Sequence, residues 1–201
     1  MVTELSRRRV PAPERREQIL AAARDLFVEQ GVVSASMRAI AARVGITPTA
    51  IYDHFKDKEA LLAAIAIGFF GDLVDAIAAA IAPEKTPEGR FKAMGRAYVK
   101  FGLHHPQEYR LLFMSPSARL RRPSERVDPM TDAYRMLEDA VAALMEAGFI
   151  RKKEPRTVAE ASWAMVHGLV ALRITHTTFD FSDLDDVLET ALAMHLDALK
   201  P

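Results

Sequence analysis

The amino-acid sequence predicts an all-α protein of about nine helices. Apolar residues recur three or four positions apart through most of its 201 residues, as expected for helices with one buried face. The sequence lacks alternating β-branched runs and the Asn-Gly and Asp-Gly pairs that mark β-hairpins. Half of the residues are apolar, and 27 basic residues balance 27 acidic ones, which is typical of a soluble globular chain.

Caps, glycines and prolines set the limits of the first three predicted helices. The first opens at Pro13, which suits a first-turn position, and stops at Gly31. The second runs from an N-cap at Ser36 to Gly45. The third begins at an N-cap, Thr47, followed by a proline, and it is over by about residue 55.

The later helices are longer and are separated by prolines. Asp57 caps a long fourth helix that ends before Pro83, and the stretch 115–129, with three prolines, is expected to be a loop. The other helices are expected at about 88–105, 106–113, 130–147, 155–177 and 183–199, the last with a capping-box-like start at Ser182 and Asp185. We expect a basic arm at 1–12, a first domain at 13–58 and a second domain at 59–201.

The second and third predicted helices are too short to be stable alone, so they must pack on the first. Two short helices joined by a Gly-centred turn and supported by a third helix are typical of the helix-turn-helix motif. In that motif the N-terminal end of the second short helix enters the major groove of DNA. Residues 1–58 also carry ten Lys and Arg against seven Asp and Glu, which fits a polyanionic partner.

Residues 15–62 resemble the DNA-binding domain of TetR-family transcriptional regulators. The resemblance rests on an apolar-Ala pair, a turn glycine before an apolar residue, a Tyr three residues before an aromatic one, and a Lys-Glu-x-Leu sequence. These are Ile40-Ala41, Gly45-Ile46, Tyr52, Phe55 and Lys58-Glu59-x-Leu61.

The resemblance implies that the start of the first short helix and the recognition helix contact operator DNA. The positions carried over are Ser36, Met37, Arg38, Thr47, Pro48, Thr49, Tyr52, Asp53, His54 and Lys58. Hydroxyl, imidazole and ammonium groups suit phosphate, and the Pro48 ring suits a thymine methyl group. Asp53 departs from this chemistry, because a carboxylate repels phosphate unless it accepts from a cytosine amino group or pairs with a neighbouring cation. Arg7-Arg8-Arg9 fits a DNA-binding arm, a solvated tail or a translation-start leader.

The helix expected at 155–177 is apolar nearly all round between Ala161 and Leu172, so more than one of its sides must be covered. The same helix of a second copy, with the helix at 183–199, gives the simplest cover and predicts a two-fold homodimer. The last two helices of TetR-family proteins form the dimer in the same way. The residues expected at this interface are Met165, Leu169, Leu172, Leu188, Leu192 and His195.

The second domain also resembles one C-terminal variant of the TetR family, the WHG type, through Trp163-x-x-x-His167-Gly168 and His105-Pro106-x-x-Tyr109. Methionine and aromatic residues in a helical bundle line either an adaptable apolar pocket or an ordinary core. The candidates for a small-molecule site are Phe69, Met94, Tyr98, Phe101, Phe113, Tyr134, Trp163 and His167. For His167, a structural role between helices is the alternative reading.

Three functions are compatible with a helix-turn-helix domain followed by a helical domain. The first is a DNA-binding transcriptional regulator, a repressor that a small apolar ligand releases from its operator when the fourth helix shifts. The second is a constitutive DNA-binding protein, and the third is a helical enzyme or carrier. The sequence has no cysteine, no zinc or di-iron ligand spacing, and no nucleophile-elbow, phosphate-loop or dinucleotide motif, so we expect no catalysis, metal or cofactor.

The expected location is the cytoplasm. The longest apolar run, from Ala60 to Gly71, stops well short of the roughly 18 residues of a membrane span. The lack of cysteine suits a reducing compartment.

Overall fold

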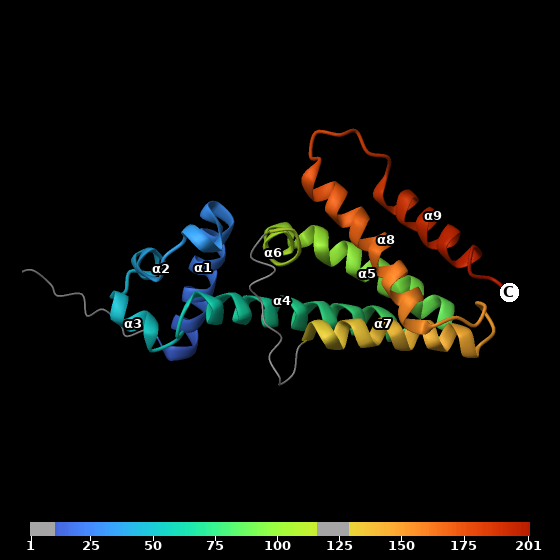
Figure 1. Cartoon of the computed structure of the whole chain (residues 1–201), viewed down its shortest axis with the longest axis horizontal. Coiled ribbons are helices and arrows are strands. Elements are labelled where there is room, and N and C mark those ends of the chain that lie inside the picture. Colours follow the sequence, from blue (N-terminus) through green and yellow to red (C-terminus); the bar gives the residue numbers. More distant parts are fainter. Residues whose placement is uncertain (1–10, 116–128) are drawn as a thin grey trace, which may run out of the picture. The chain divides into compact units, whose positions relative to one another are not determined.

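The computed structural model describes residues 11–115 and 129–201, and these residues form nine α-helices and one π-helical segment without a strand (Figure 1). This confirms the all-α class. The residues 116–128 of the expected loop and the Arg7-Arg8-Arg9 arm lie outside the described residues.

The chain divides into two compact units. The first takes in the chain up to Ala66 and a further stretch that begins at Leu111, and the second begins at Ile67 and takes in α5 to α9. The division falls inside α4, so this one helix contributes residues to both units.

The first unit contains α1, α2, α3 and the start of α4, with bounds Ala12–Ser34, Met37–Val44, Pro48–Tyr52 and Lys58–Ile81. Gly31 interrupts α1 with φ 77° and ψ 153°, a backbone conformation that favours glycine, so the regular helix stops where the sequence predicts. The caps are also as predicted, since the side chains of Ser36, Thr47 and Asp57 accept hydrogen bonds from the N–H groups of Ala39, Ala50 and Ala60.

One apolar cluster holds this unit together. Its fully buried members come from α1, α2, α3 and α4, and include Ile19, Ala23, Ile40, Ile51 and Leu61. Ile51 belongs to a helix of only five residues, which packing rather than helix propensity must stabilise. A single inward side chain thus leaves the rest of α3 free to face solvent.

The second unit contains α5 (Pro87–His104), α6 (Pro106–Tyr109), α7 (Pro129–Glu146), α8 (Pro155–Thr175) and α9 (Leu184–Asp197). The π-helical segment η1 (Arg110–Met114) follows α6, and only its first residue, Arg110, belongs to the second unit. Helices α5, α7 and α8 pack against one another, and α9 packs on α5 and α8. Glycines on α5 allow the close approach, since a Cβ on Gly102 would lie 2.8 Å from a Val170 methyl and 3.0 Å from the Tyr109 ring.

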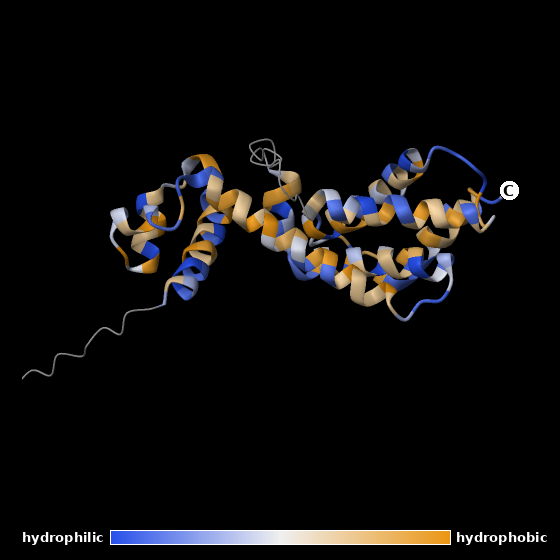
Figure 2. Ribbon diagram, turned by 90° about the horizontal axis from the view of Figure 1, so that it is seen from below, coloured by the Kyte–Doolittle hydropathy of each residue, from blue (hydrophilic) through white to orange (hydrophobic). Residues whose placement is uncertain are grey.

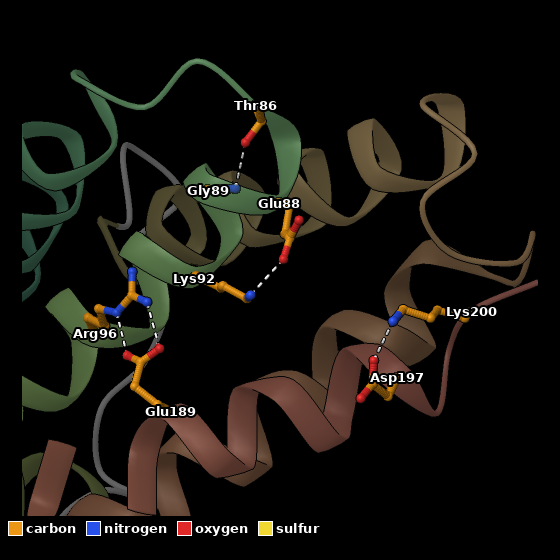
Figure 3. A network of polar contacts seen from close by, with 8 residues as sticks. All are labelled: Thr86, Glu88, Gly89, Lys92, Arg96, Glu189, Asp197 and Lys200. Atoms are coloured by element: carbon orange, nitrogen blue, oxygen red, sulfur yellow. Dashed lines mark hydrogen bonds and ion pairs between the residues drawn. The ribbon is translucent and has the colours of Figure 1, made fainter. Parts of the chain in front are cut away.

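Polar contacts fasten α9 along α5, as Figure 3 shows. Arg96 donates two hydrogen bonds to the Glu189 carboxylate, at 2.5 and 2.6 Å. The N-cap of α9 differs from the expected one, because Asp183 rather than Ser182 accepts from the N–H groups of Asp185 and Asp186. A carboxylate at this position also favours the positive end of the helix dipole.

Figure 2 shows hydrophobic and hydrophilic residues alternating along the helices, as expected where one face is buried. Helix α4 is the most apolar of them, and by length and composition alone it could cross a membrane. Core helices of soluble proteins meet the same criterion, and Leu61, Leu62, Phe69 and Leu73 of α4 are buried within the chain.

Candidate functional site

The turn between α2 and α3 presents the N-terminal end of α3 to solvent. Gly45 adopts φ 74° and ends α2, and the N–H of the next residue, Ile46, donates to the Ala41 carbonyl. Thr47 then caps α3, and Pro48 takes the first helical position, where its missing N–H costs nothing. The result is a short helix whose first two residues, Pro48 and Thr49, are exposed.

Seven of the ten positions expected to contact DNA are exposed together on α2 and α3. They are Ser36, Arg38, Thr47, Pro48, Thr49, Tyr52 and Asp53, while His54 and Lys58 are half-buried. Tyr52 is 56% exposed although it is a large aromatic residue, and it carries a free phenol in the described part of the chain. Hydroxyls, a guanidinium and a phenol on one surface suit phosphate oxygens and base edges.

Met37 is the exception among these positions, because its side chain is buried in the core. The expectation that this side chain contacts DNA is therefore corrected. Helical periodicity explains the difference, since Met37, Ile40 and Ala41 share the inward face of α2.

Lys58 makes contacts that its sequence position does not suggest. Its ammonium donates to the carbonyls of Val32 and Val33, at 2.7 and 2.8 Å. Those carbonyls lie at the C-terminal end of α1, so Lys58 joins the first turn of α4 to the end of α1.

Asp53 is exposed at the C-terminal end of α3, and within the described residues it forms no ion pair with Arg or Lys. Of the two roles left open for this carboxylate, pairing with a cation thus finds no support in the ranges 11–115 and 129–201. Acceptance from a cytosine amino group stays a prediction.

Two contacts that the sequence did not reveal stabilise the arrangement of α1, α2 and α3. Arg43 at the end of α2 forms a bidentate pair with Glu29 of α1, with both N–O distances at 2.8 Å. This pairing holds the pKa of Glu29 below its usual value and raises that of Arg43. Arg16 of α1 lies over the ring of Phe55, 4.9 Å from its centre, just beyond α3.

A second constellation of polar aromatic side chains lies within the second unit. The Trp163 indole N–H donates to the Tyr98 hydroxyl at 2.9 Å, and the Tyr98 and Tyr109 hydroxyls lie 3.0 Å apart. His167 Nδ1 lies 2.5 Å from the Tyr109 hydroxyl and 3.3 Å from that of Tyr98. The edge of Tyr134 meets the Trp163 ring. We call these five residues the aromatic cluster.

Burial decides the protonation states in this cluster. Desolvation lowers the pKa of His167 and raises the pKa values of Tyr98 and Tyr109. A neutral His167 accepts from the Tyr109 hydroxyl through Nδ1 and carries its proton on Nε2. The cluster is therefore uncharged near neutral pH, and it offers hydroxyl, imidazole and indole groups among aromatic rings.

The structure unites four of the eight expected ligand residues in this cluster: Tyr98, Tyr134, Trp163 and His167. Phe69 contacts the rings of Phe70 and Phe101, and Phe101 contacts that of His105. Met94 is buried on α5, and Phe113 is half-buried in the segment that belongs to the first unit. Tyr109 was not among the candidates, although the His105-Pro106-x-x-Tyr109 pattern could have pointed to it.

Three of the six residues expected at a dimer interface are used inside the chain. Leu188 and Leu192 are each 1% exposed, and His195 stacks on Phe91 and bonds to Ser162. Leu188 and Leu192 are buried where α9 packs on α5 and α8, which corrects their assignment to an interface, whereas His195 is half-buried and stays a candidate. Leu172 is 51% exposed, and Met165 and Leu169 are half-buried, so these three stay candidates.

The hydrogen bond between Ser162 and His195 runs in the wrong direction, from histidine to serine, for nucleophilic catalysis. The Ser162 hydroxyl donates to the Val158 carbonyl at 2.7 Å, so its oxygen accepts from His195 Nε2 at 2.8 Å. A catalytic histidine must instead accept the serine proton. Burial also keeps Ser162 only 3% exposed, and we interpret this pair as a structural link between helices.

Comparisons with known proteins agree with this arrangement. Residues 19–65 match the model of the tetR family of bacterial regulatory proteins. Residues 91–195, more than half of the chain, match the tetracyclin repressor-like C-terminal domain. The second match spans both motifs on which the C-terminal resemblance rests.

Individual relatives extend the comparison. The HTH-type transcriptional activator FasR of Mycolicibacterium smegmatis is 32% identical over 125 residues, which are 62% of this chain and 57% of FasR. The HTH-type transcriptional regulator UidR of Escherichia coli K12 is 52% identical over 50 residues, a quarter of each chain (25% and 26%). A crystal structure of a tetR-family regulatory protein from Rhodococcus RHA1 shares the fold, with a TM-score of 0.74, 23% identity and coverage of 93% of this chain and 97% of that one.

Both parts of the molecule thus agree with one family. The first has two short helices, α2 and α3, supported by α1, and the second is a helical unit whose sequence match covers more than half of the chain. The chain belongs to the TetR family of transcriptional regulators.

Proposed function

We propose that the protein is a repressor that binds operator DNA through α2 and α3 and leaves it when a small, largely apolar molecule binds the second unit. The observation that carries the DNA-binding step is the joint exposure of Ser36, Arg38, Thr47, Thr49 and Tyr52 on two short helices. The hydroxyl groups and the single guanidinium on these two helices fit the phosphate backbone of DNA and the adjacent base edges.

Dimerisation is the second part of the proposal. Ala161, Ala164, Gly168 and Leu172 recur on one face of α8, and each is exposed or half-buried. Met194 of α9 is 68% exposed. A second copy of the chain would cover these apolar residues and place two recognition helices on successive major grooves, roughly 34–36 Å apart.

The effector is the third part. The aromatic cluster combines apolar rings with uncharged hydrogen-bonding groups, and Tyr134, Trp163 and His167 are only half-buried. This chemistry suits an apolar molecule with one or two polar atoms. Helix α4 is the continuous backbone between the two units, and a shift of α4 on binding would change the separation of the recognition helices.

A constitutive DNA-binding protein is the alternative. The hydrogen bonds that already join Tyr98, Tyr109, His167 and Trp163 favour this alternative. A ligand that broke these bonds would have to replace them with its own. We place either protein in the cytoplasm, where operator DNA is accessible.

Selection of genomic DNA by the purified protein tests the proposal, followed by a screen of small molecules for release of the recovered DNA. We expect two-fold symmetric sites, affinity that falls steeply with salt, and release by an apolar compound. Recovery of specific DNA that no compound releases would favour the constitutive alternative, and absence of salt-dependent binding would reject both. A reporter behind the recovered site distinguishes repression from activation.

A further inference from the structure

Lys58 occupies a position that its own helix disfavours. It is the first residue of α4, where the positive end of the helix dipole repels a cation. Its ammonium turns instead to the carbonyls of Val32 and Val33. Carbonyls at a helix C-terminus lack intrahelical partners and lie at the negative end of the dipole, so a cation is favoured there.

The two carbonyls belong to the last turn of α1, which follows the break at Gly31 and leads directly into α2. Gly31 breaks α1, the N–H of Ala35 returns to the Gly31 carbonyl at 3.1 Å, and Ser36 caps α2 directly afterwards. The side chains of Val32 and Ala35 are buried, at 3% and 1% exposed, whereas that of Val33 is 79% exposed. The hydrogen bonds from Lys58 therefore add a direct link from α4 to the backbone of a segment that side-chain packing also holds.

We propose that Lys58 is a positioning residue for DNA binding and not a phosphate contact: its ammonium holds the Val32–Val33 turn and, through it, the first turn of α2 with Ser36. This inference rests on the proposed function. It also joins the N-terminal end of α4 to the start of the DNA-binding surface, so that a displaced α4 moves the Ser36 hydroxyl as well as α3.

A double-mutant cycle on the full chain tests the inference, using the DNA site recovered by genomic selection. Lys58→Met removes the ammonium, Ser36→Ala removes the hydroxyl, and the double variant measures their coupling. Lys56→Met is the matched control, because Lys56 is an exposed lysine two positions earlier and its loss changes the net charge equally. Affinities are measured by fluorescence anisotropy at several salt concentrations, and amide hydrogen exchange is measured on the free proteins.

We expect Lys58→Met to lower the affinity roughly tenfold at every salt concentration, with the salt slope of the parent. Its effect and that of Ser36→Ala should be less than additive, because both act through the first turn of α2. Amides from Ala35 to Ala39 should exchange faster in Lys58→Met than in the parent. In Lys56→Met the exchange should match the parent, and its effect on affinity should add to that of Ser36→Ala.

A direct phosphate contact gives the opposite pattern and overturns the proposal: a salt slope reduced by about 0.9, additive effects and unchanged exchange near α2. Lys58→Gln keeps an N–H donor without the charge, and it replaces Lys58→Met if circular dichroism shows the latter unfolded. For Lys58→Gln the salt slope alone decides: the slope of the parent supports the positioning role, and a reduced slope rejects it. If the parent selects no DNA, the proposed function fails, and the exchange data still decide whether Lys58 holds the Val32–Val33 turn.

Discussion

At the scale of single residues, exposure separates the side chains that hold the fold from those that remain available to a partner. Tyr52 and Asp53 are exposed at the end of α3, whereas Ile51 beside them is fully buried. In the second unit, burial also affects protonation, because desolvation lowers the pKa values of His167 and His195 and so favours their neutral forms. Two predictions belong to this scale.

Tyr52→Phe removes one hydroxyl from the DNA-binding surface and leaves the ring in place. We expect a loss of about 0.5–1.5 kcal/mol in binding free energy, a few-fold in affinity, on every DNA sequence. The salt slope should not change, since the phenol is neutral. Tyr134→Phe, in the second unit, is the control, and an equal effect from it would contradict the assignment of Tyr52.

The two half-buried histidines, His167 and His195, should make stability depend on pH. Their pKa values are lowered in the folded protein, so the unfolded chain binds protons more readily below its own pKa of about 6.5. Stability is then complete above pH 7 and falls as the pH drops towards 5. Thermal unfolding at the two pH values measures this loss.

Variants that keep the hydrogen bond assign the loss to the histidines. His167→Asn retains an acceptor in place of Nδ1, and His195→Gln retains a donor in place of Nε2. We expect each variant to lose less stability than the parent between pH 7 and pH 5. The variant His176→Gln, at an exposed position, should lose as much stability as the parent. A parent protein that is equally stable at pH 7 and pH 5 would refute this account.

At the scale of elements, the close packing of α5 on α8 depends on Gly102, and α9 is held by buried leucines and by the pair of Arg96 and Glu189. The ion pair is largely exposed, so its contribution to stability is expected to be small. Packing therefore dominates the stability of the second unit.

Gly102→Ala adds a methyl group where Val170 and Tyr109 leave no room. We expect a destabilisation of about 1–3 kcal/mol, because both neighbours belong to the packed interior. Gly68→Ala in α4 is the matched control, since nothing lies within 4 Å of the added Cβ, and it should stabilise the helix by about 0.5–1 kcal/mol. Chemical denaturation of both variants measures the difference, and equal effects would show that the approach of α5 to α8 is not tight.

At the scale of the whole molecule, the exposed apolar residues Leu172 of α8 and Met194 of α9 support the proposed assembly of two chains. A dimer of this kind would read two half-sites, so it would matter for affinity as well as for stability. The remaining prediction concerns this interface.

Leu172→Glu combined with Met194→Glu places charges on the proposed dimer face. We expect a monomer by analytical ultracentrifugation, with operator binding weakened because the two half-sites are no longer linked. Ile67→Glu is the control, since Ile67 has the same exposed fraction as Leu172, 51%, on a different helix. A double variant that remains dimeric would remove this face from the proposal.

The sequence by itself determined the all-α class, nearly all helix limits, the caps at Ser36, Thr47 and Asp57, and the exposed face of α3. These features depend on local interactions, within one or two helical turns, and local interactions can be recognised in a linear pattern. The recognition of the family followed from the same short-range spacing.

Only the tertiary structure decided which apolar residues face inward and which polar groups meet. It placed Met37, Leu188 and Leu192 in the core, brought Tyr109 to His167, and gave the Lys58 ammonium its two carbonyl acceptors. A helix such as α8 or α9 has several faces that could be buried, and its neighbours in space select one of them. These neighbours are distant in the sequence, so the selection is a property of the packed molecule.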